Sequence, residues 1–395
     1  MQQNFSNLNF LVGNEKIISN IKETPVLPIF SDLIVKFLIE LSNKLLANPK
    51  AKEYVDVISY AFWIRKSSIE QEKKRYNLGK VGRGVALHIA PSNVPVAFAM
   101  SFTAALLAGN PCIVRVSNKE YEQVNIICSA INEIISSSIP QMSKYITIIR
   151  YEHDEEITQM LTDLCDIRVI WGGDRTINTI RRTSLPSRAI ELTFADRHSL
   201  AIIDSDKYLE SNYDVVAKDF YADTYFIDQN ACSSPRLIVW TGNNIEKAKD
   251  IFWKNIEYLV DNDYSMQPVK VVDKLDSFCK LAAYHKGVTL IKEKNSLYRV
   301  SLKELTKDVM ELKDNSGYFF EYSAQNLDEM VPVLSKKCQT IAYYGISPED
   351  IKQAIVAKGV RGVDRIVPLG KTMELTLIWD GYDLVDSMSR IINLR

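Results

Sequence analysis

One cysteine, Cys232, stands in a setting that suits covalent chemistry. It lies in the polar, turn-rich segment DQNACSSPR, residues 228–236, directly before an apolar run. A thiolate among small polar residues at the start of an element can be exposed and stabilised by backbone N–H groups, which makes it a nucleophile. The alternative is an inert, half-buried cysteine. Cys112, in an apolar run, and Cys128 and Cys165, in or beside helical segments, already fit that alternative.

Two further segments have the residue types of a binding site. The turn APSNVP, residues 90–95, offers the amide of Asn93 between two prolines at the end of a strand-like run. Its alternative role is a rigid connection between a strand and a helix. Further along, Gly172 and Gly173 follow another strand-like run. Such glycines let backbone N–H groups approach a phosphate at a helix start, although a Gly-Gly turn is also an ordinary way to begin a helix.

The spacing of cysteines and histidines does not favour metal or disulfide chemistry. The six cysteines are scattered without a CxxC pair, and the four histidines show no HxxxH or His–Cys spacing. We therefore expect no metal and reduced thiols, as in a cytoplasmic protein. The N-terminal residues lack the basic and apolar regions of a signal peptide, and the longest apolar stretch, 94–109, is shorter than the ~20 residues of a membrane span. No membrane span is expected.

The elements that must position these residues alternate between strands and helices. The strand-like runs are 85–90, 112–116, 146–149 and 167–171, and the helical segments between them are 96–107, 120–135 and 155–164. This alternation predicts an α/β fold with a parallel sheet covered on both faces. Ligands of such sheets bind beyond the carboxyl ends of the strands, where the loops 91–95, 117–119 and 172–174 would meet. Before the sheet, helices are predicted at 29–46 and 51–76.

The overall composition excludes several classes of partner. The 395 residues include 48 Lys and Arg against 49 Asp and Glu, a net charge of −1. A bulk electrostatic attraction to nucleic acid or to an anionic membrane is therefore not expected. With 46% hydrophobic residues the chain can build substantial cores, and its length suggests two or three domains.

The order of the motifs resembles the aldehyde dehydrogenase superfamily, in which a PxNxP turn, a lysine-containing strand end, a glycine pair and a QxxC-like catalytic segment follow one another. More closely, the chain resembles the LuxC type of acyl-CoA reductase, the fatty acyl thioester reductases of bacterial bioluminescence. The matching stretches are GRGV (82–85), APSNVP (90–95), WGGD (171–174), DQNACSSP (228–235), RIVPLG (365–370) and WDGYDL (379–384). Each motif is short, and their collinearity carries the resemblance.

The resemblance implies an aldehyde dehydrogenase-like fold of two Rossmann-like parallel-sheet domains with a small oligomerisation element. We expect N-terminal helices and a dinucleotide-binding domain in 1–200, with an arm near 72–84. A catalytic domain carrying the nucleophile would follow in 201–372, and a C-terminal oligomerisation segment in 373–395. A strand is predicted at 374–379. Because such arms and terminal strands tend to extend a neighbour's sheet, a homodimer or tetramer is expected.

The activity implied by the resemblance is NADPH-dependent reduction of an acyl thioester to the aldehyde. Cys232 would attack an acyl-CoA or an acylated protein, and the nicotinamide would reduce the acyl-enzyme. The Asn93 amide and the Cys232 N–H would stabilise the oxyanion. An acyl-transferring synthetase is an expected partner. Two alternatives stay open: an aldehyde dehydrogenase that oxidises aldehyde to acid, and a non-catalytic acyl- or nucleotide-binding subunit.

The cofactor preference is argued from charges after the second strand. Relatives that prefer NAD have a Glu three residues after the lysine, and Asn118 occupies that position here. Loss of the carboxylate beside Arg115 and Lys119 suits a 2′-phosphate, which predicts NADPH. The alternative is that these two cations are only surface charges. The expected cofactor-binding residues are Ser92, Arg115, Ser117, Lys119, Gly172 and Gly173.

Two residues, Glu191 and His198, are candidates for acid–base chemistry. Relatives that oxidise aldehydes hydrolyse the acyl-enzyme with a Glu on a LELGG segment, and this chain reads IELTFADRHS at 190–199, without the glycines. Aligning on Glu191 makes that residue the base, whereas aligning on Ser199 places His198 near the same spot, and both alignments stay open. Loss of the base would fit a reductase, because hydrolysis wastes the acyl group. His198 would then protonate the leaving thiolate, or be a polar loop residue.

Overall fold

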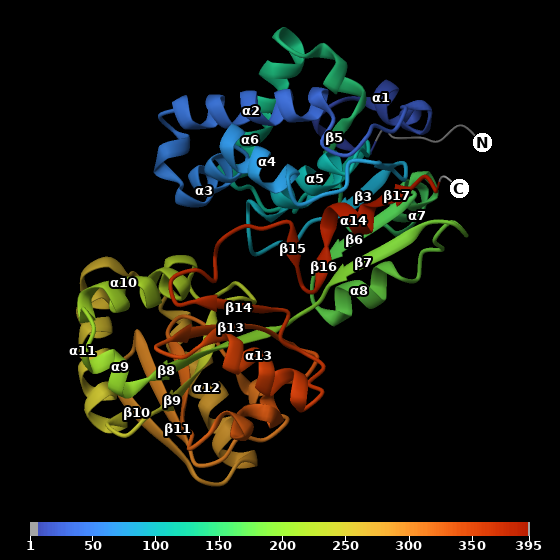
Figure 1. Ribbon diagram of the computed structural model, residues 1–395. Helices are drawn as coiled ribbons and strands as arrows, with labels where there is room; N and C mark the ends of the chain where they lie inside the picture. The colour runs from blue at the N-terminus through green and yellow to red at the C-terminus, as the bar shows by residue number, and fades with distance from the viewer. Residues whose placement is uncertain (1–6, 394–395) are drawn as a thin grey trace. The chain divides into compact units, whose positions relative to one another are not determined.

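The computed structural model describes residues 7–393, which divide into two compact units. Unit 1 runs up to residue 195 and resumes at residue 375, and unit 2 comprises residues 196–374. Each unit is built on its own sheet with helices packed against it (Figure 1). The α/β class with parallel-sheet domains is therefore confirmed. The functional assignment of the predicted domains, with boundaries at 200 and 372, stays a prediction.

Unit 1 contains a six-stranded sheet in the order β1-β5-β4-β3-β6-β7. Its strands are β1 (Asn9–Val12), β3 (Ala86–Ile89), β4 (Cys112–Arg115), β5 (Ile146–Arg150), β6 (Ile167–Trp171) and β7 (Ile190–Phe194). All neighbouring pairs are parallel except β1 with β5. The predicted alternation of strands 85–90 and 112–116 with helix 96–107 is thus confirmed, with α5 (Ala97–Leu107) joining β3 to β4.

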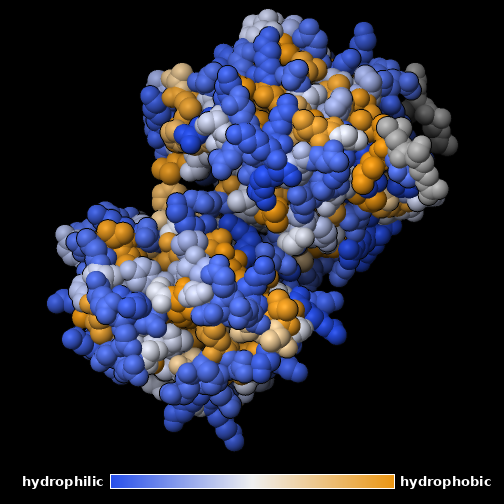
Figure 2. Space-filling model, viewed as in Figure 1, coloured by the Kyte–Doolittle hydropathy of each residue, from blue (hydrophilic) through white to orange (hydrophobic). Residues whose placement is uncertain are grey.

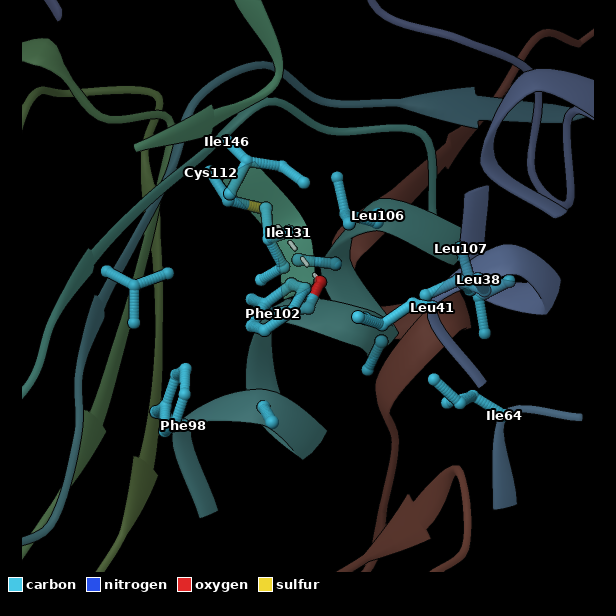
Figure 3. Packing of buried hydrophobic residues seen from close by; sticks show 14 of the residues in the cluster. Leu38, Leu41, Ile64, Phe98, Phe102, Leu106, Leu107, Cys112, Ile131 and Ile146 are labelled. Atoms are coloured by element: carbon cyan, nitrogen blue, oxygen red, sulfur yellow. Dashed lines mark hydrogen bonds between the residues drawn. The ribbon is translucent and has the colours of Figure 1, made fainter. Parts of the chain in front are cut away.

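Helices cover both faces of this sheet because successive strand residues point to opposite sides. The helices are α1 (Glu15–Ser19), α2 (Asp32–Ala47), α3 (Val55–Trp63), α4 (Lys66–Lys73), α5, α6 (Glu122–Ser137), α7 (Glu155–Leu164), α8 (Asp174–Ile180) and α14 (Leu384–Met388). Helices α2, α5 and α6 share one core with the sheet, and α7 and α8 share the core of the other face. Figure 3 shows Phe98 and Phe102 of α5, Leu41 of α2 and Cys112 of β4, which all belong to the first core.

The N-terminal region differs from its prediction in two respects. Residues 9–12 form the edge strand β1, and the helix predicted at 51–76 is broken into a short 3₁₀ turn, α3 and α4. At the break, Arg65 has extended backbone angles, φ −67° and ψ 158°. Ile64 and Ile69 on either side of it pack into the same core. Apolar spacing alone does not reveal such a corner, because both helices serve one core.

The C-terminal segment packs within unit 1. β15 (Ile378–Trp379) and β16 (Tyr382–Asp383) form a small hairpin, and β17 (Ser389–Ile391) pairs antiparallel with β2 (Lys80–Gly82) of the same chain. The strand predicted at 374–379 is therefore wrong except for its last two residues. The Thr376 hydroxyl donates to the Ile378 carbonyl at 2.6 Å, a local turn that competes with a ladder. The predicted oligomer stays a prediction.

Unit 2 contains a seven-stranded sheet in the order β10-β11-β12-β9-β8-β13-β14, parallel except for the edge pair β10–β11. Its strands are β8 (His198–Asp204), β9 (Pro235–Thr241), β10 (Val288–Lys294), β11 (Leu297–Leu302), β12 (Tyr318–Ser323), β13 (Cys338–Tyr344) and β14 (Arg365–Pro368). Its helices are α9 (Ser205–Leu209), α10 (Tyr213–Asp223), α11 (Ile245–Asp263), α12 (Val269–Tyr284) and α13 (Pro348–Ala357). Two buried clusters lie on its two faces.

The surface is mixed in polarity. Figure 2 shows hydrophilic residues over most of the visible face, with apolar residues interspersed. Within residues 7–393, no helix combines the length and apolar character that crossing a bilayer would require.

Candidate active site

Cys232 lies in the loop between the 3₁₀ turn Tyr225–Ile227 and β9 of unit 2, and its side chain is partly exposed. The remaining cysteines differ from it. Cys279 is exposed on α12, and the four buried ones are Cys112, Cys128, Cys165 and Cys338. Burial raises the pKa of each buried thiol, to about 12 for Cys128. Buried, protonated thiols are inert, so Cys232 and Cys279 are the two that reagents reach.

The cysteine loop is anchored by the buried side chain of Gln229. Its amide nitrogen donates to the carbonyls of Pro235 at 3.0 Å and Tyr318 at 3.2 Å. Its amide oxygen accepts from the N–H groups of Gly317 at 3.0 Å and Tyr318 at 3.1 Å. Gln229 has φ +56°, a left-handed conformation that costs a non-glycine residue free energy. The four hydrogen bonds offset that cost and fix the loop to the first residues of β9 and β12.

A second anchor is the buried guanidinium of Arg236. It donates to the carbonyls of Gln229 at 2.6 Å, Ala231 at 3.3 Å and Asp314 at 3.0 Å. Burial lowers the pKa of Arg236, and a charged Cys232 is the strongest charge interaction that raises it again. The cysteine therefore sits in the positive field of a cation that its own loop surrounds.

The loop is also held from β8 and from the segment that follows β14. The Ser199 hydroxyl donates to the Cys232 carbonyl at 2.7 Å. Asp223, at the end of α10, accepts from the N–H groups of Gly370 at 2.7 Å and Thr372 at 3.0 Å, and burial raises its pKa to about 6. These contacts hold the segment 370–373, whose Met373 sulfur accepts from the Ser233 hydroxyl at 3.6 Å.

In unit 1, the predicted binding loops gather at the carboxyl ends of three adjacent strands, β4, β3 and β6. The Tyr121 hydroxyl donates to the Ser92 carbonyl at 2.8 Å, which ties the loop after β3 to the loop after β4. Asn93 is exposed, and its amide has no partner among the residues that the structure describes. Ser117 is buried and accepts from the Lys119 N–H at 3.1 Å, while Lys119 itself is exposed. The loops are thus ordered and present an unengaged amide and a cation.

Of the other residues predicted to bind the cofactor, Arg115 and Gly172 contact other parts of unit 1, whereas Gly173 is open. Arg115 donates to the Tyr151 carbonyl at 3.4 Å and lies over the Tyr151 ring, 5.4 Å from its centroid. The N–H of Gly172 donates to the Phe194 carbonyl at 3.1 Å, which conflicts with the phosphate contact predicted for it. Gly173 caps α8, and the space beside its Cα is open. Of the pair, Gly173 is the one that a ligand can approach.

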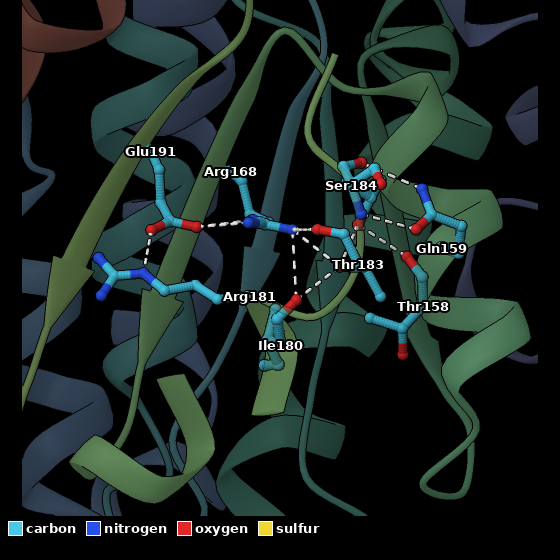
Figure 4. A network of polar contacts seen from close by, with 9 residues as sticks. Thr158, Gln159, Arg168, Ile180, Arg181, Thr183, Ser184 and Glu191 are labelled. Carbon is cyan, nitrogen blue, oxygen red and sulfur yellow. Dashed lines mark hydrogen bonds and ion pairs between the residues drawn. The ribbon is translucent and has the colours of Figure 1, made fainter. Parts of the chain in front are cut away.

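Glu191 does not have the environment of a catalytic base. Both oxygens of its carboxylate are engaged in unit 1, one by Arg168 at 2.6 and 2.8 Å and the other by Arg181 at 2.7 Å (Figure 4). Arg168, only 3% exposed, also donates to the Thr183 hydroxyl at 2.8 Å. A carboxylate that neutralises a buried guanidinium is committed to that ion pair, because breaking the pair would leave an uncompensated buried charge. The predicted role of Glu191 as base therefore conflicts with this network.

His198 is likewise committed to the interior. It is 3% exposed at the start of β8, and its Nε2 lies 3.1 Å from the Val333 carbonyl. Burial lowers its pKa to about 4, so the ring is neutral near pH 7. A neutral, buried imidazole bonded to a carbonyl is poorly placed to protonate a leaving thiolate. The polar loop alternative is also wrong, because His198 belongs to a strand.

Sequence reasoning missed several residues of this region. Gln229 and Arg236 flank the cysteine, but each also binds a distant segment, Gln229 at Gly317 and Tyr318 and Arg236 at Asp314. An aromatic group was also missed: Trp171, at the carboxyl end of β6, stacks on Phe194 with centroids 3.9 Å apart, and Tyr382 packs edge-on against Phe194. A tryptophan directly before the glycine pair was the available signal. Within residues 7–393, no group of three His, Cys, Asp or Glu side chains is arranged to hold a metal.

Comparison with known proteins agrees with these features. A profile of the acyl-CoA reductase (LuxC) family matches residues 64–391. The long-chain acyl-protein thioester reductase of Aliivibrio fischeri is 27% identical over 304 residues, 73% of this chain and 58% of that protein. The enzyme of the same name from Vibrio harveyi is 27% identical over 297 residues, 73% of this chain and 59% of that protein. The chain thus spans about three fifths of the length of these relatives.

Solved structures support the fold. Lactaldehyde dehydrogenase from Escherichia coli has a TM-score of 0.66 at 12% identity, covering 95% of this chain and 88% of that one. 1-Pyrroline-5-carboxylate dehydrogenase from Thermus with bound NAD has a TM-score of 0.64 at 12% identity, covering 96% and 83%. At this identity the likeness extends to the fold alone, which is that of aldehyde dehydrogenases.

Proposed function

Because the chain belongs to the LuxC family of acyl-CoA reductases, we propose that it reduces an acyl thioester to the aldehyde, with Cys232 as the covalent nucleophile. The observation that carries the proposal is the setting of Cys232, a partly exposed thiol on a loop fixed by Gln229 and surrounding the buried Arg236. The relatives are named long-chain acyl-protein thioester reductases. We therefore propose a long-chain acyl group, carried on CoA or on a protein, as the substrate.

The chemistry begins with attack of the Cys232 thiolate on the thioester carbonyl. The carbon–sulfur bond to the carrier breaks, the carrier leaves as a thiolate, and an acyl-cysteine remains. A nicotinamide cofactor, NADPH in this proposal, would supply a hydride to the acyl carbon of the acyl-cysteine. The bond from that carbon to the Cys232 sulfur would then break, which would release the aldehyde and leave Cys232 as a thiolate. The Cys232 N–H and the exposed Asn93 amide are the proposed donors to the oxyanion, and loss of one such donor costs about 3 kcal/mol of transition-state stabilisation.

The loops at the carboxyl ends of the unit 1 strands support the choice of NADPH as the cofactor. The residue proposed to face the adenosine ribose is Asn118, which adds no negative charge, and Lys119 beside it is exposed. Open space beside Gly173 admits a phosphate. Arg115 is partly occupied by Tyr151, so Lys119 is the stronger candidate for the 2′-phosphate. The homo-oligomer and the acyl-transferring partner remain proposals beside this one.

The test is intact-mass measurement after incubation with a panel of acyl-CoAs without cofactor. We expect one acyl adduct per chain in the wild type and in Cys279→Ala, and none in Cys232→Ala. Cys279→Ala is the matched control because it removes the exposed thiol of α12. An adduct that persists in Cys232→Ala would refute the assignment. Free CoA released in step with aldehyde and NADPH consumption separates the reductase from an enzyme that forms the acid.

A further inference from the structure

The most unusual buried group near the nucleophile is the Arg236 side chain. Only 8% of this residue is exposed, and all of its hydrogen bonds in the structure go to backbone carbonyls. Buried guanidinium groups are normally paired with a carboxylate, because an unneutralised cation is costly away from water. In unit 2, Arg299 follows that rule, with Glu321 at 2.9 Å. Arg236 does not follow it, because within the described residues its partners are the carbonyls of Gln229, Ala231 and Asp314 and no carboxylate.

The acidic groups around Arg236 are engaged elsewhere. Asp314 accepts from the Ser277 hydroxyl at 2.6 Å, and Asp196 is paired with Lys313 at 3.0 Å. His198 on the neighbouring strand is neutral, since burial lowers its pKa to about 4. A charged Cys232, Asp196 and Asp314 each raise the pKa of Arg236, with Cys232 the largest of these influences. Because Cys232 also directly follows Ala231, whose carbonyl Arg236 binds at 3.3 Å, its thiolate is the anion that we assign to this cation.

We propose that Arg236 is a positioning residue that shapes the cysteine loop and holds the sulfur of Cys232 as a thiolate. The Arg236 guanidinium donates hydrogen bonds to the carbonyls of Gln229 at 2.6 Å and Ala231 at 3.3 Å, just before the cysteine. A third hydrogen bond, to the Asp314 carbonyl at 3.0 Å, connects this loop to the segment before β12. The geometry therefore couples loop shape to charge: the same group that fixes the turn supplies the positive field. The effect of Arg236 on the Cys232 thiol does not depend on the proposed function. Only the consequence of that effect for catalysis rests on Cys232 being the nucleophile.

A lysine would not replace this arginine fully. The planar guanidinium of Arg236 donates to three carbonyls in different directions, whereas the lysine ammonium is a compact charge at the end of a flexible alkyl chain. We therefore expect Arg236→Lys to keep much of the field but loosen the loop, and Arg236→Met to remove the field while keeping an apolar side chain of similar length. Ser199→Ala is the matched control, because it removes a hydrogen bond to the Cys232 carbonyl without changing any charge.

The experiment is the pH profile of iodoacetamide alkylation at Cys232, read peptide by peptide by mass spectrometry. Because a nearby cation stabilises a thiolate, we expect the midpoint of the profile to rise by about one pH unit or more in Arg236→Met. Alkylation of Cys232 at pH 7 should then be roughly tenfold slower than in the wild type. Arg236→Lys should stay within about half a unit of the wild type. Ser199→Ala should change the plateau rate and leave the midpoint in place.

An unchanged midpoint in Arg236→Met, or an equal shift in Ser199→Ala, would overturn the proposal. If Arg236→Met does not fold by circular dichroism, Arg236→Gln is measured in its place, with the same expected shift. Alkylation needs no acyl substrate. A shifted midpoint in a protein whose Cys232 takes up no acyl group would uphold this inference and overturn the proposed function, so the two failures are distinguishable.

Discussion

Replacing Gln229 by alanine should release the cysteine loop. The side chain makes four buried hydrogen bonds, to Pro235, Gly317 and both backbone groups of Tyr318. Each is worth about 1 kcal/mol net, so the loop and the adjoining strand ends should lose about 4 kcal/mol of local stability. An alanine at position 229 would still need the left-handed backbone conformation, φ +56° in Gln229, and would lack the hydrogen bonds that offset the free-energy cost of that conformation.

Hydrogen exchange followed by mass spectrometry measures this loss locally. For peptides covering 225–240 and 314–320, about 4 kcal/mol corresponds to roughly thousandfold faster exchange when the exchange rate follows the opening equilibrium. Asn230→Ala is the control, since it removes a single bond, from the Asn315 amide to Asn230 at 2.8 Å, and should speed exchange about tenfold or less. Exchange in Gln229→Ala within tenfold of wild type would show that the anchor does not hold the loop.

Three further predictions concern other sites. Glu191→Gln should lower the free energy of unfolding of unit 1, measured in urea, by about 3 kcal/mol, because Arg168 loses its buried partner. Arg181→Gln, at a half-exposed residue, should cost under about 1 kcal/mol. Acyl-enzyme hydrolysis that continues unchanged in Glu191→Gln would exclude Glu191 as a base. Because the pKa of Asp223 is raised from 3.8 to about 6, its contribution to stability is complete below about pH 4 and lost as the pH rises through 6, roughly 3 kcal/mol in all. Urea unfolding of wild type against Asp223→Asn should show that slope in the wild type only. Asn118→Glu should move the ratio of kcat/KM for NADPH over NADH toward NADH by about tenfold or more, and an unchanged ratio would contradict the proposed 2′-phosphate site.

The sequence predicts best the elements whose apolar pattern matches their burial. β6 matches its predicted range, 167–171, because its largely apolar strand is buried. α7 matches 155–164 because its buried residues, Leu161 and Leu164 among them, lie on one side of an otherwise polar helix. The segment carrying Cys232 was also found, since its composition departs from its surroundings. The contacts of Gln229 and Glu191 were not predicted because their partners are distant in the chain. Gln229 is hydrogen-bonded to Tyr318, and Glu191 forms an ion pair with Arg168. Side-chain roles set by such tertiary partners leave no local pattern.

The insertion of unit 2 between two parts of unit 1 has a consequence for biosynthesis. The antiparallel partner of β2 is β17, and the Met388 carbonyl accepts the buried Asn110 amide at 2.9 Å. Neither contact can form until residues 196–374 have been translated, which takes roughly 10–40 s at about 5–20 residues per second. During that interval β2 of the nascent first unit lacks its antiparallel partner, so unit 1 completes this pairing only after the whole of unit 2 has been synthesised.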